Sequence, residues 1–216
     1  MKTGFLKKFV SLILITAALT LTLTSCSKSK TLNQYKEDTS TEEKDTYYVA
    51  MDVKYYGVII LKLDAKAAPI TVKNFVKLVR EGFYDGLTFH RVIDNFMIQG
   101  GDPDANGLGG SDEEIFGEFL YNGYNNPIKH ERGVISMARA QDYNSASSQF
   151  FICNANSVNV SNLDYQYAAF GHVIEGMEVV DEITSYSLAF TGNNGMISDK
   201  KNQAKIAEMK VIIYEE

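Results

Sequence analysis

Residues 89–103 read FHRVIDNFMIQGGDP and hold two short runs of aliphatic and aromatic residues around one arginine and one glutamine. Runs of this composition favour β-strands, which we predict over residues 87–93 and 96–100. Because the side chains of a strand point alternately to its two faces, Met97 and Gln99 share one face of the second strand. That face therefore presents an apolar side chain beside an amide, close in sequence to Arg91.

A third predicted strand, residues 149–153, repeats this arrangement with Gln149 and Phe151 on one face. Arg91 is a permanent cation in an apolar neighbourhood, and it is expensive to desolvate unless acceptors such as glutamine oxygens bind it. The pattern predicts an apolar patch with amides at its rim and one oriented guanidinium, which suits a neutral ligand that contains amide groups. Without this context, the apolar side chains would be interpreted as ordinary core residues.

The chain from residue 47 onward combines short strand patterns with turn signals and two helical patterns. Apolar residues at helical spacing predict one helix that begins at Pro69 and ends at Gly82, and a second over residues 177–185. This content indicates a mainly β domain, either a closed antiparallel barrel or a sandwich, and closure is favoured because it removes exposed strand edges. The other strands are predicted at residues 47–53, 57–63, 133–138, 168–173 and 206–214.

The first 25 residues have the pattern of an export signal. Three lysines precede an uncharged apolar run over residues 9–23, whose length fits a signal sequence better than a full membrane span. The run ends LTSC at residues 23–26 and resembles the bacterial lipobox, in which one aliphatic and two small residues precede a cysteine. The resemblance implies that residues 1–25 are removed and that Cys26 becomes an acylated N-terminus, with several acyl chains giving lasting anchorage. The alternatives are an uncleaved membrane helix and a soluble secreted protein.

Residues 26–46 are polar and charged, and we predict a flexible tether there, ahead of a folded domain over residues 47–216. The whole chain has a formal charge of −6. Loss of residues 1–25 removes three lysines and leaves 18 basic against 27 acidic residues, a charge of −9. This acidity argues against nucleic acid or anionic lipid as the main partner. Cys153 ends an apolar run and is interpreted as a buried core residue.

Four segments together resemble the cyclophilin family of peptidyl-prolyl cis-trans isomerases. They read FHRVI at 89–93, FMIQGGDP at 96–103, SMARA at 136–140 and SSQFFI at 147–152. Further matches are RG at 132–133, LD at 163–164 and AFG at 169–171, so the similarity covers roughly residues 47–216. The resemblance implies a closed eight-stranded antiparallel β-barrel capped by two α-helices, with the substrate groove on the outer surface of the barrel.

The resemblance also implies a role for individual residues. Arg91 would be the catalytic arginine, and Gln99 would orient it. Phe96, Met97, Phe151 and Leu163 would form the proline pocket, and Ala138, Arg139 and Gln149 would line the extended peptide groove.

Three positions depart from the best-known members of the family. Tyr167 stands in place of a histidine and keeps an aromatic wall with a polar tip. Asn162 stands in place of a tryptophan and loses a large surface and an indole donor, which implies weaker binding of cyclosporin. Arg139 stands in place of an asparagine, at a position where the family uses mainly its backbone.

The implied function is to accelerate rotation about X-Pro peptide bonds and so assist the folding of exported proteins at the extracytoplasmic face of a cell membrane. The expected partners are proline-containing unfolded or extended polypeptides, and the protein is expected to be a monomer. Rotation makes and breaks no bond, so we expect no cofactor and no metal. The alternatives are a non-catalytic holdase that uses the same groove and a solute-binding lipoprotein. The pairing of Arg91 with Gln99 favours the enzyme.

Overall fold

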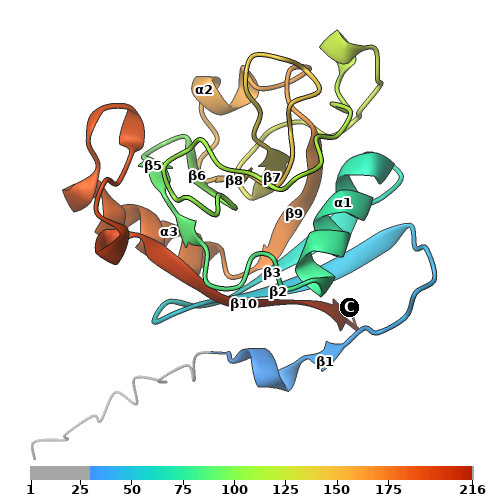
Figure 1. The fold of residues 1–216 in the computed structure, drawn as a ribbon, viewed down its shortest axis with the longest axis horizontal. Helices are drawn as coiled ribbons and strands as arrows, with labels where there is room; N and C mark the ends of the chain where they lie inside the picture. Colours follow the sequence, from blue (N-terminus) through green and yellow to red (C-terminus); the bar gives the residue numbers. More distant parts are fainter. Residues whose placement is uncertain (1–29, 216) are drawn as a thin grey trace, which may run out of the picture.

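The structure, a computed structural model, describes residues 30–215. The predicted export signal over residues 1–25 and Cys26 lie outside the described residues. Figure 1 shows a curved antiparallel sheet, with helix α1 (Pro69–Arg80) and helix α3 (Met177–Ser187) packed at different places along it. The prediction of a mainly β domain with few helices is confirmed. Among residues 30–215, no helix is both long enough and apolar enough to cross a membrane.

Ten strands form the sheet in the order β1-β10-β2-β3-β9-β7-β8-β6-β5, and β4 pairs with β10 beside this path. The strands are β1 (Lys36–Glu37), β2 (Thr46–Val53), β3 (Gly57–Asp64), β4 (Thr88–Phe89), β5 (Arg91–Ile93), β6 (Met97–Gly100), β7 (Val134–Met137), β8 (Phe150–Cys153), β9 (Ala169–Glu175) and β10 (Ala204–Ile213). Every predicted strand is present, except that the one over residues 87–93 is divided into β4 and β5.

The prediction of a closed barrel with eight strands is wrong, because the sheet is open and has ten strands. The interruption falls at His90. β4 pairs with β10 while β5 pairs with β6, so the chain changes its partner at this residue. The outer edge of β5 is covered instead by residues 192–197, the orange-red loop beside β5 in Figure 1. There Met196 forms a β-bridge with Arg91, and the Ile197 N–H donates to the His90 carbonyl at 2.9 Å.

Helix α1 begins where the sequence places it and packs an aromatic core. Pro69 lies in its first turn, where a missing N–H costs nothing. The buried Glu118 carboxylate accepts from the next two amides, Ile70 N at 3.0 Å and Thr71 N at 2.8 Å, which satisfies donors that a helix leaves unpaired. The Phe75 ring then packs against other rings, with centroids 5.0–5.6 Å from those of Tyr84, Phe150 and Phe170. A single helical turn, α2 (Val158–Ser161), was not predicted.

Strand alternation divides the apolar side chains of β6, β7 and β8 between two clusters. Ile98, Ile135 and Ile152 belong to the main core. Their neighbours in the chain, Met97, Val134, Phe151 and Cys153, point to the opposite face. They form a smaller cluster with Val160 from α2 and Ala169 from β9. Cys153 is wholly buried, as predicted, and burial raises the pKa of its thiol to about 12. The smaller cluster supports the candidate site described below.

Residues 30–38, which we call the N-terminal strap, lie on the domain. β1 pairs with β10, and Leu32 is 4% exposed in a cluster with Ala50, Val58, Ile60 and Ile212. Downstream of the strap, Ser40 accepts from Arg80 through its carbonyl, and Glu43 pairs with Lys73. Of the tether predicted over residues 26–46, the structure describes residues 30–46, and these contact the folded domain. One leucine and a few tyrosines give no periodic signal, yet they dock because the outer face of the sheet offers them an apolar surface.

Candidate functional site

A hollow of ≈250 Å³ opens on the outer side of β5, β6 and β8, above the smaller apolar cluster. Nine residues from five separate segments meet there: Arg91, Phe96, Met97, Gln99, Ala138, Arg139, Phe151, Leu163 and Tyr167. The structure thus brings together all the substrate and catalytic residues that the sequence singled out, apart from Gln149. Gln149 lies in a neighbouring hollow of ≈600 Å³, which shares Gln99, Ala138 and Arg139 with the first.

The register of the strands explains why these residues meet. Arg91 on β5 lies directly opposite Gln99 on β6, and Gln99 lies directly opposite Phe151 on β8. Directly opposite residues project to the same face of a sheet, so the three side chains form one row across three strands. A slip of one residue in any of these pairings would turn one member of the row into the core.

Hydrogen bonds link the two polar members of this row, Arg91 and Gln99, to Gln149 in a single arrangement. Arg91 Nη1 donates to Gln99 Oε1 at 3.0 Å, and Gln99 Nε2 donates to Gln149 Oε1 at 2.8 Å. Gln149 Nε2 in turn donates to the Gly109 carbonyl at 2.8 Å. Each amide therefore uses its oxygen toward the arginine and its nitrogen away from it. This polarity fixes which oxygen faces the guanidinium.

The Arg91 guanidinium is held on a second side by a backbone group that the sequence did not indicate. Its Nε donates to the Asn194 carbonyl at 2.8 Å, from the loop that covers the outer edge of β5. Burial lowers the pKa of Arg91, but an arginine remains charged across the physiological range. Among residues 30–215, Nη2 of Arg91 has no hydrogen-bond partner. A cation is thus fixed at the hollow with donor capacity to spare.

The floor and the rim of the hollow differ in exposure. Met97 and Phe151 form a buried floor, 1% and 4% exposed, and they are also members of the smaller apolar cluster. Phe96, Leu163 and Tyr167 are half-buried and form the rim. The Tyr167 ring meets Phe151 edge to face, with centroids 5.8 Å apart and planes at 83°. The floor residues are therefore both core and pocket, so the interpretation as core residues is correct in part.

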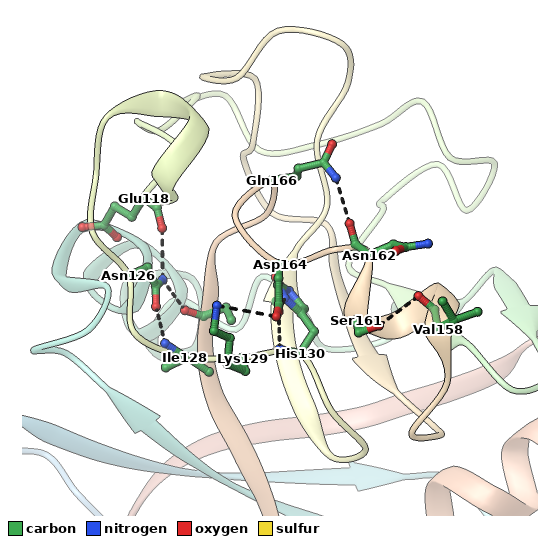
Figure 2. Close-up of polar contacts among 12 residues, drawn as sticks. Glu118, Asn126, Ile128, Lys129, His130, Val158, Ser161, Asn162, Asp164 and Gln166 are labelled. Carbon is green, nitrogen blue, oxygen red and sulfur yellow. Dashed lines mark hydrogen bonds and ion pairs between the residues drawn. The ribbon is translucent and has the colours of Figure 1, made fainter.

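A buried polar chain lies behind Phe151. His130 stacks on the Phe151 ring with centroids 6.1 Å apart, and its Nδ1 and Nε2 lie 3.1 Å from Asp164 Oδ1 and 3.0 Å from Ser136 Oγ. Figure 2 shows Asp164 beside His130, one residue after Leu163 at the rim. A serine, a histidine and a carboxylate in line resemble a hydrolase triad. Ser136 is wholly buried, however, so its hydroxyl cannot reach a substrate. This hydrogen-bonded series instead supports the Phe151 ring from the buried side, through His130.

Burial lowers the pKa of His130, although the Asp164 carboxylate opposes this shift. The imidazole is therefore neutral near pH 7, with one nitrogen donating and the other accepting. No local pattern in the sequence indicates this polar chain, because the partners of His130 lie 6 and 34 positions away. Among the described residues, no three His, Cys, Asp or Glu side chains are grouped so that they could hold a metal ion.

The Arg139 side chain contacts three aromatic rings, although the sequence indicated a role mainly for its backbone. Its guanidinium carbon lies 4.7 Å from the Tyr167 ring centroid, 4.9 Å from Tyr143 and 5.3 Å from Phe119. Its Nε donates to the Gln166 carbonyl at 3.1 Å. This side chain therefore packs the segment around Tyr167 against the wall between the two hollows.

Asn162, which stands in place of the family's tryptophan, does not line either hollow. It is exposed at the end of α2, and its carbonyl accepts from Gln166 Nε2 at 2.8 Å, as Figure 2 shows. The rim beside Leu163 is accordingly open on this side.

Comparisons with known proteins agree with this geometry. Residues 48–211 match the family described as cyclophilin type peptidyl-prolyl cis-trans isomerase/CLD. Peptidyl-prolyl cis-trans isomerase B of Escherichia coli is 40% identical over 158 residues, which cover 71% of this chain and 92% of that protein. A peptidyl-prolyl cis-trans isomerase of Helicobacter pylori is 46% identical over 129 residues, covering 59% of this chain and 74% of that protein.

The fold is also found in solved structures. The crystal structure of a cyclophilin-type peptidyl-prolyl cis-trans isomerase from Cryptosporidium parvum superposes with a TM-score of 0.67 at 27% identity, covering 79% of this chain and 99% of that one. A second structure of that protein, in the presence of the dipeptide Ala-Pro, superposes with a TM-score of 0.65 at 29% identity, covering 78% and 99%.

Proposed function

The chain belongs to the cyclophilin-type family and is a peptidyl-prolyl cis-trans isomerase, and on that premise we propose how its residues act and where it works. Arg91 is the catalytic residue, and Gln99 positions it. The ring of the substrate proline enters the hollow over Met97 and Phe151. The observation that carries this proposal is the guanidinium fixed by Gln99 and Asn194, with Nη2 unpaired among residues 30–215.

The chemistry follows from the resonance of the amide. Rotation about a peptide bond costs about 18–20 kcal/mol, because it breaks the conjugation between the nitrogen and the carbonyl. In the twisted state the nitrogen regains a lone pair, and a donor aimed at that nitrogen stabilises this state more than either planar isomer. Arg91 supplies such a donor without gaining or losing a proton. The hollow holds the ring while the preceding carbonyl turns.

A binding-only holdase would need the apolar floor but not the chain of oriented amides. The hydrogen-bonded series Arg91, Gln99 and Gln149 therefore favours turnover. Loss of one such oriented donor typically costs about 100- to 1000-fold in rate. Replacement of Arg91 by lysine keeps the charge but loses the planar guanidinium, which donates to Gln99 from one side and to Asn194 from another.

NMR line-shape analysis of a prolyl peptide separates exchange rate from affinity at equilibrium. We expect Arg91→Ala and Arg91→Lys to lower the catalysed exchange rate by about 100-fold or more with little change in affinity. Phe151→Ala should weaken both quantities, since the floor grips the ring throughout. Arg80→Ala, at an exposed arginine that binds the Ser40 carbonyl away from the hollow, is the matched control. Near-wild-type exchange in Arg91→Ala, with affinity lost, would make Arg91 a binding residue and the holdase the better description.

The same proposal places the enzyme at a membrane. The lipobox-like ending at Cys26 supports acylation there, and the partners would be proline-containing segments of exported polypeptides. Cys26→Ser should abolish incorporation of radiolabelled palmitate, whereas Cys153→Ser, at the buried thiol, should leave it unchanged. Equal labelling of the wild type and the Cys26 variant would contradict the anchor and leave the isomerase assignment intact.

A further inference from the structure

The N-terminal strap begins at one end of the sheet. Lys30 forms an ion pair with Glu175 at the end of β9, and Tyr214 donates to the same carboxylate at 2.6 Å. Glu175 lies opposite Ile60, three positions into β3 from the β2–β3 turn at residues 54–56. The strap therefore begins near this turn, and Figure 1 shows its first blue residues close to the turn at the lower left.

Only four peptide steps connect Lys30 to Cys26, so they span at most about 15 Å. The reach of a lipid on Cys26 is thus much shorter than a free segment of residues 26–46 would give, because residues 30–38 are used in docking. With Cys26 acylated as proposed above, the end of the sheet that carries the β2–β3 turn would lie close to the lipid.

One hollow at that end is lined mainly by basic side chains, although the chain is acidic. A hollow of ≈550 Å³ between the turn and residues 200–205 is lined by four exposed lysines: Lys54, Lys200, Lys201 and Lys205. Two carboxylates accompany them, Glu182 in the lining and Asp199, which lies 2.7 Å from Lys201 Nζ. These four lysines and two carboxylates together carry a charge of +2, in contrast to −9 for residues 26–216.

The same end carries exposed aromatic side chains. Tyr55, at the tip of the turn, is 92% exposed, and Lys54 Nζ lies 4.9 Å from its ring centroid. Tyr186, which also lines the hollow, is 47% exposed. Tyrosines and lysines side by side are the combination that proteins use at the boundary between water and lipid headgroups. We call this surface, Lys54, Tyr55, Lys200, Lys201 and Lys205, the basic face.

We propose that the basic face docks on an anionic lipid surface and so orients the isomerase on its membrane. This inference rests on the anchor at Cys26 proposed above. The acidic net charge of the chain argues against binding to anionic lipid, but the basic face is a local exception. Lysines within a Debye length of a headgroup are attracted by that surface, and distant carboxylates are screened from it. Figure 1 shows β6, β8 and α2 at the opposite side of the molecule from the strap.

The experiment attaches the chain covalently to vesicles. Residues 26–216 are coupled through the Cys26 thiol to a maleimide lipid, which Cys153 does not reach because it is wholly buried. Vesicles of phosphatidylcholine, with or without phosphatidylglycerol, carry a spin-labelled lipid that broadens nearby amide signals. We expect severalfold stronger broadening at residues 54–57 and 200–205 than at Phe96 and Leu163, and only with phosphatidylglycerol present.

Charge reversal supplies the matched test. Lys54→Glu, Lys200→Glu and Lys205→Glu together should abolish the difference, because each lysine at an anionic surface is worth roughly fivefold in binding. The control variant replaces Lys66, Lys73 and Lys77 by glutamate, at three exposed positions outside the basic face. It should retain the difference in broadening. The proposal would be overturned by uniform broadening, or by broadening that is strongest at the substrate hollow around Phe96 and Leu163. It would also be overturned if both triple variants lost the difference in broadening equally. Palmitate labelling of Cys26 is measured separately, so failure of the anchor and failure of the face are told apart.

Discussion

Gly195 is the residue whose substitution tests most directly how Arg91 is held. It follows Asn194, the residue whose carbonyl accepts from Arg91 Nε, and its φ is +77°. A Cβ at this position would overlap Ile93 Cγ1 and lie 2.5 Å from the Val92 carbonyl oxygen. To restore ordinary contact, the loop would have to retreat from β5 by about 1 Å.

A retreat of that size lengthens the 2.8 Å bond between Arg91 Nε and the Asn194 carbonyl to nearly 4 Å, beyond hydrogen-bond range. The guanidinium then keeps Gln99 but loses its second support. Displacement of a catalytic group by about 1 Å can cost about 100-fold in rate. We therefore expect Gly195→Ala to lower kcat by about 10- to 100-fold while KM changes by less than about threefold, since the apolar floor is untouched.

Gly123→Ala separates this effect from backbone strain. Gly123 has nearly the same left-handed conformation, with φ of +82°, but no other part of the fold comes within 4 Å of the place that a Cβ would take there. Both variants carry the left-handed penalty of about 1–2 kcal/mol, and both should lose similar stability on that account. The assay is chymotrypsin-coupled cleavage of a prolyl peptide across substrate concentrations, together with the NMR signal of Arg91 Nε–H. If Gly195→Ala keeps wild-type kcat and an unshifted Nε–H signal, Asn194 does not position Arg91.

Three further outcomes are expected. Burial holds the pKa of His130 below the value of about 6.5 that it has in the unfolded chain, so the unfolded state binds more protons in acid. This contribution to the free energy of unfolding should be complete above pH 6.5 and fall as pH drops below it; urea titrations at several pH values measure it, and His130→Gln should flatten the profile in this window. Leu32→Ala should lower the free energy of unfolding by about 2 kcal/mol, because Leu32 is buried under the strap, while Leu108→Ala, at 90% exposure, should have almost no effect; equal urea midpoints would show that the strap does not stabilise the domain. Asn162→Trp should tighten cyclosporin binding in titration calorimetry, since it adds a large aromatic surface and a donor beside the open rim; unchanged affinity would contradict the comparison drawn at this position.

Local patterns in the sequence determined the strands, the two principal helices and the strand faces on which the site residues lie. Alternation placed Met97 with Gln99 and Gln149 with Phe151, because it depends only on neighbouring residues. The resemblance of the segments around Arg91 then identified the family, and the structure brings those residues to one hollow. Even the buried state of Cys153 followed from the apolar run that it ends.

Tertiary structure alone decided the features that depend on contacts between distant segments. Asn194 and Arg91 are 103 positions apart in the sequence, and His130 and Asp164 are 34 positions apart. No local spacing of residues predicts either contact. The open ten-stranded path arose because the loop over residues 192–197, and not another strand, covers the edge of β5. The strap was predicted to be a flexible tether because its composition is polar. Its few apolar side chains dock because β2, β3 and β10 form a surface for Leu32 that exists only once the sheet has folded.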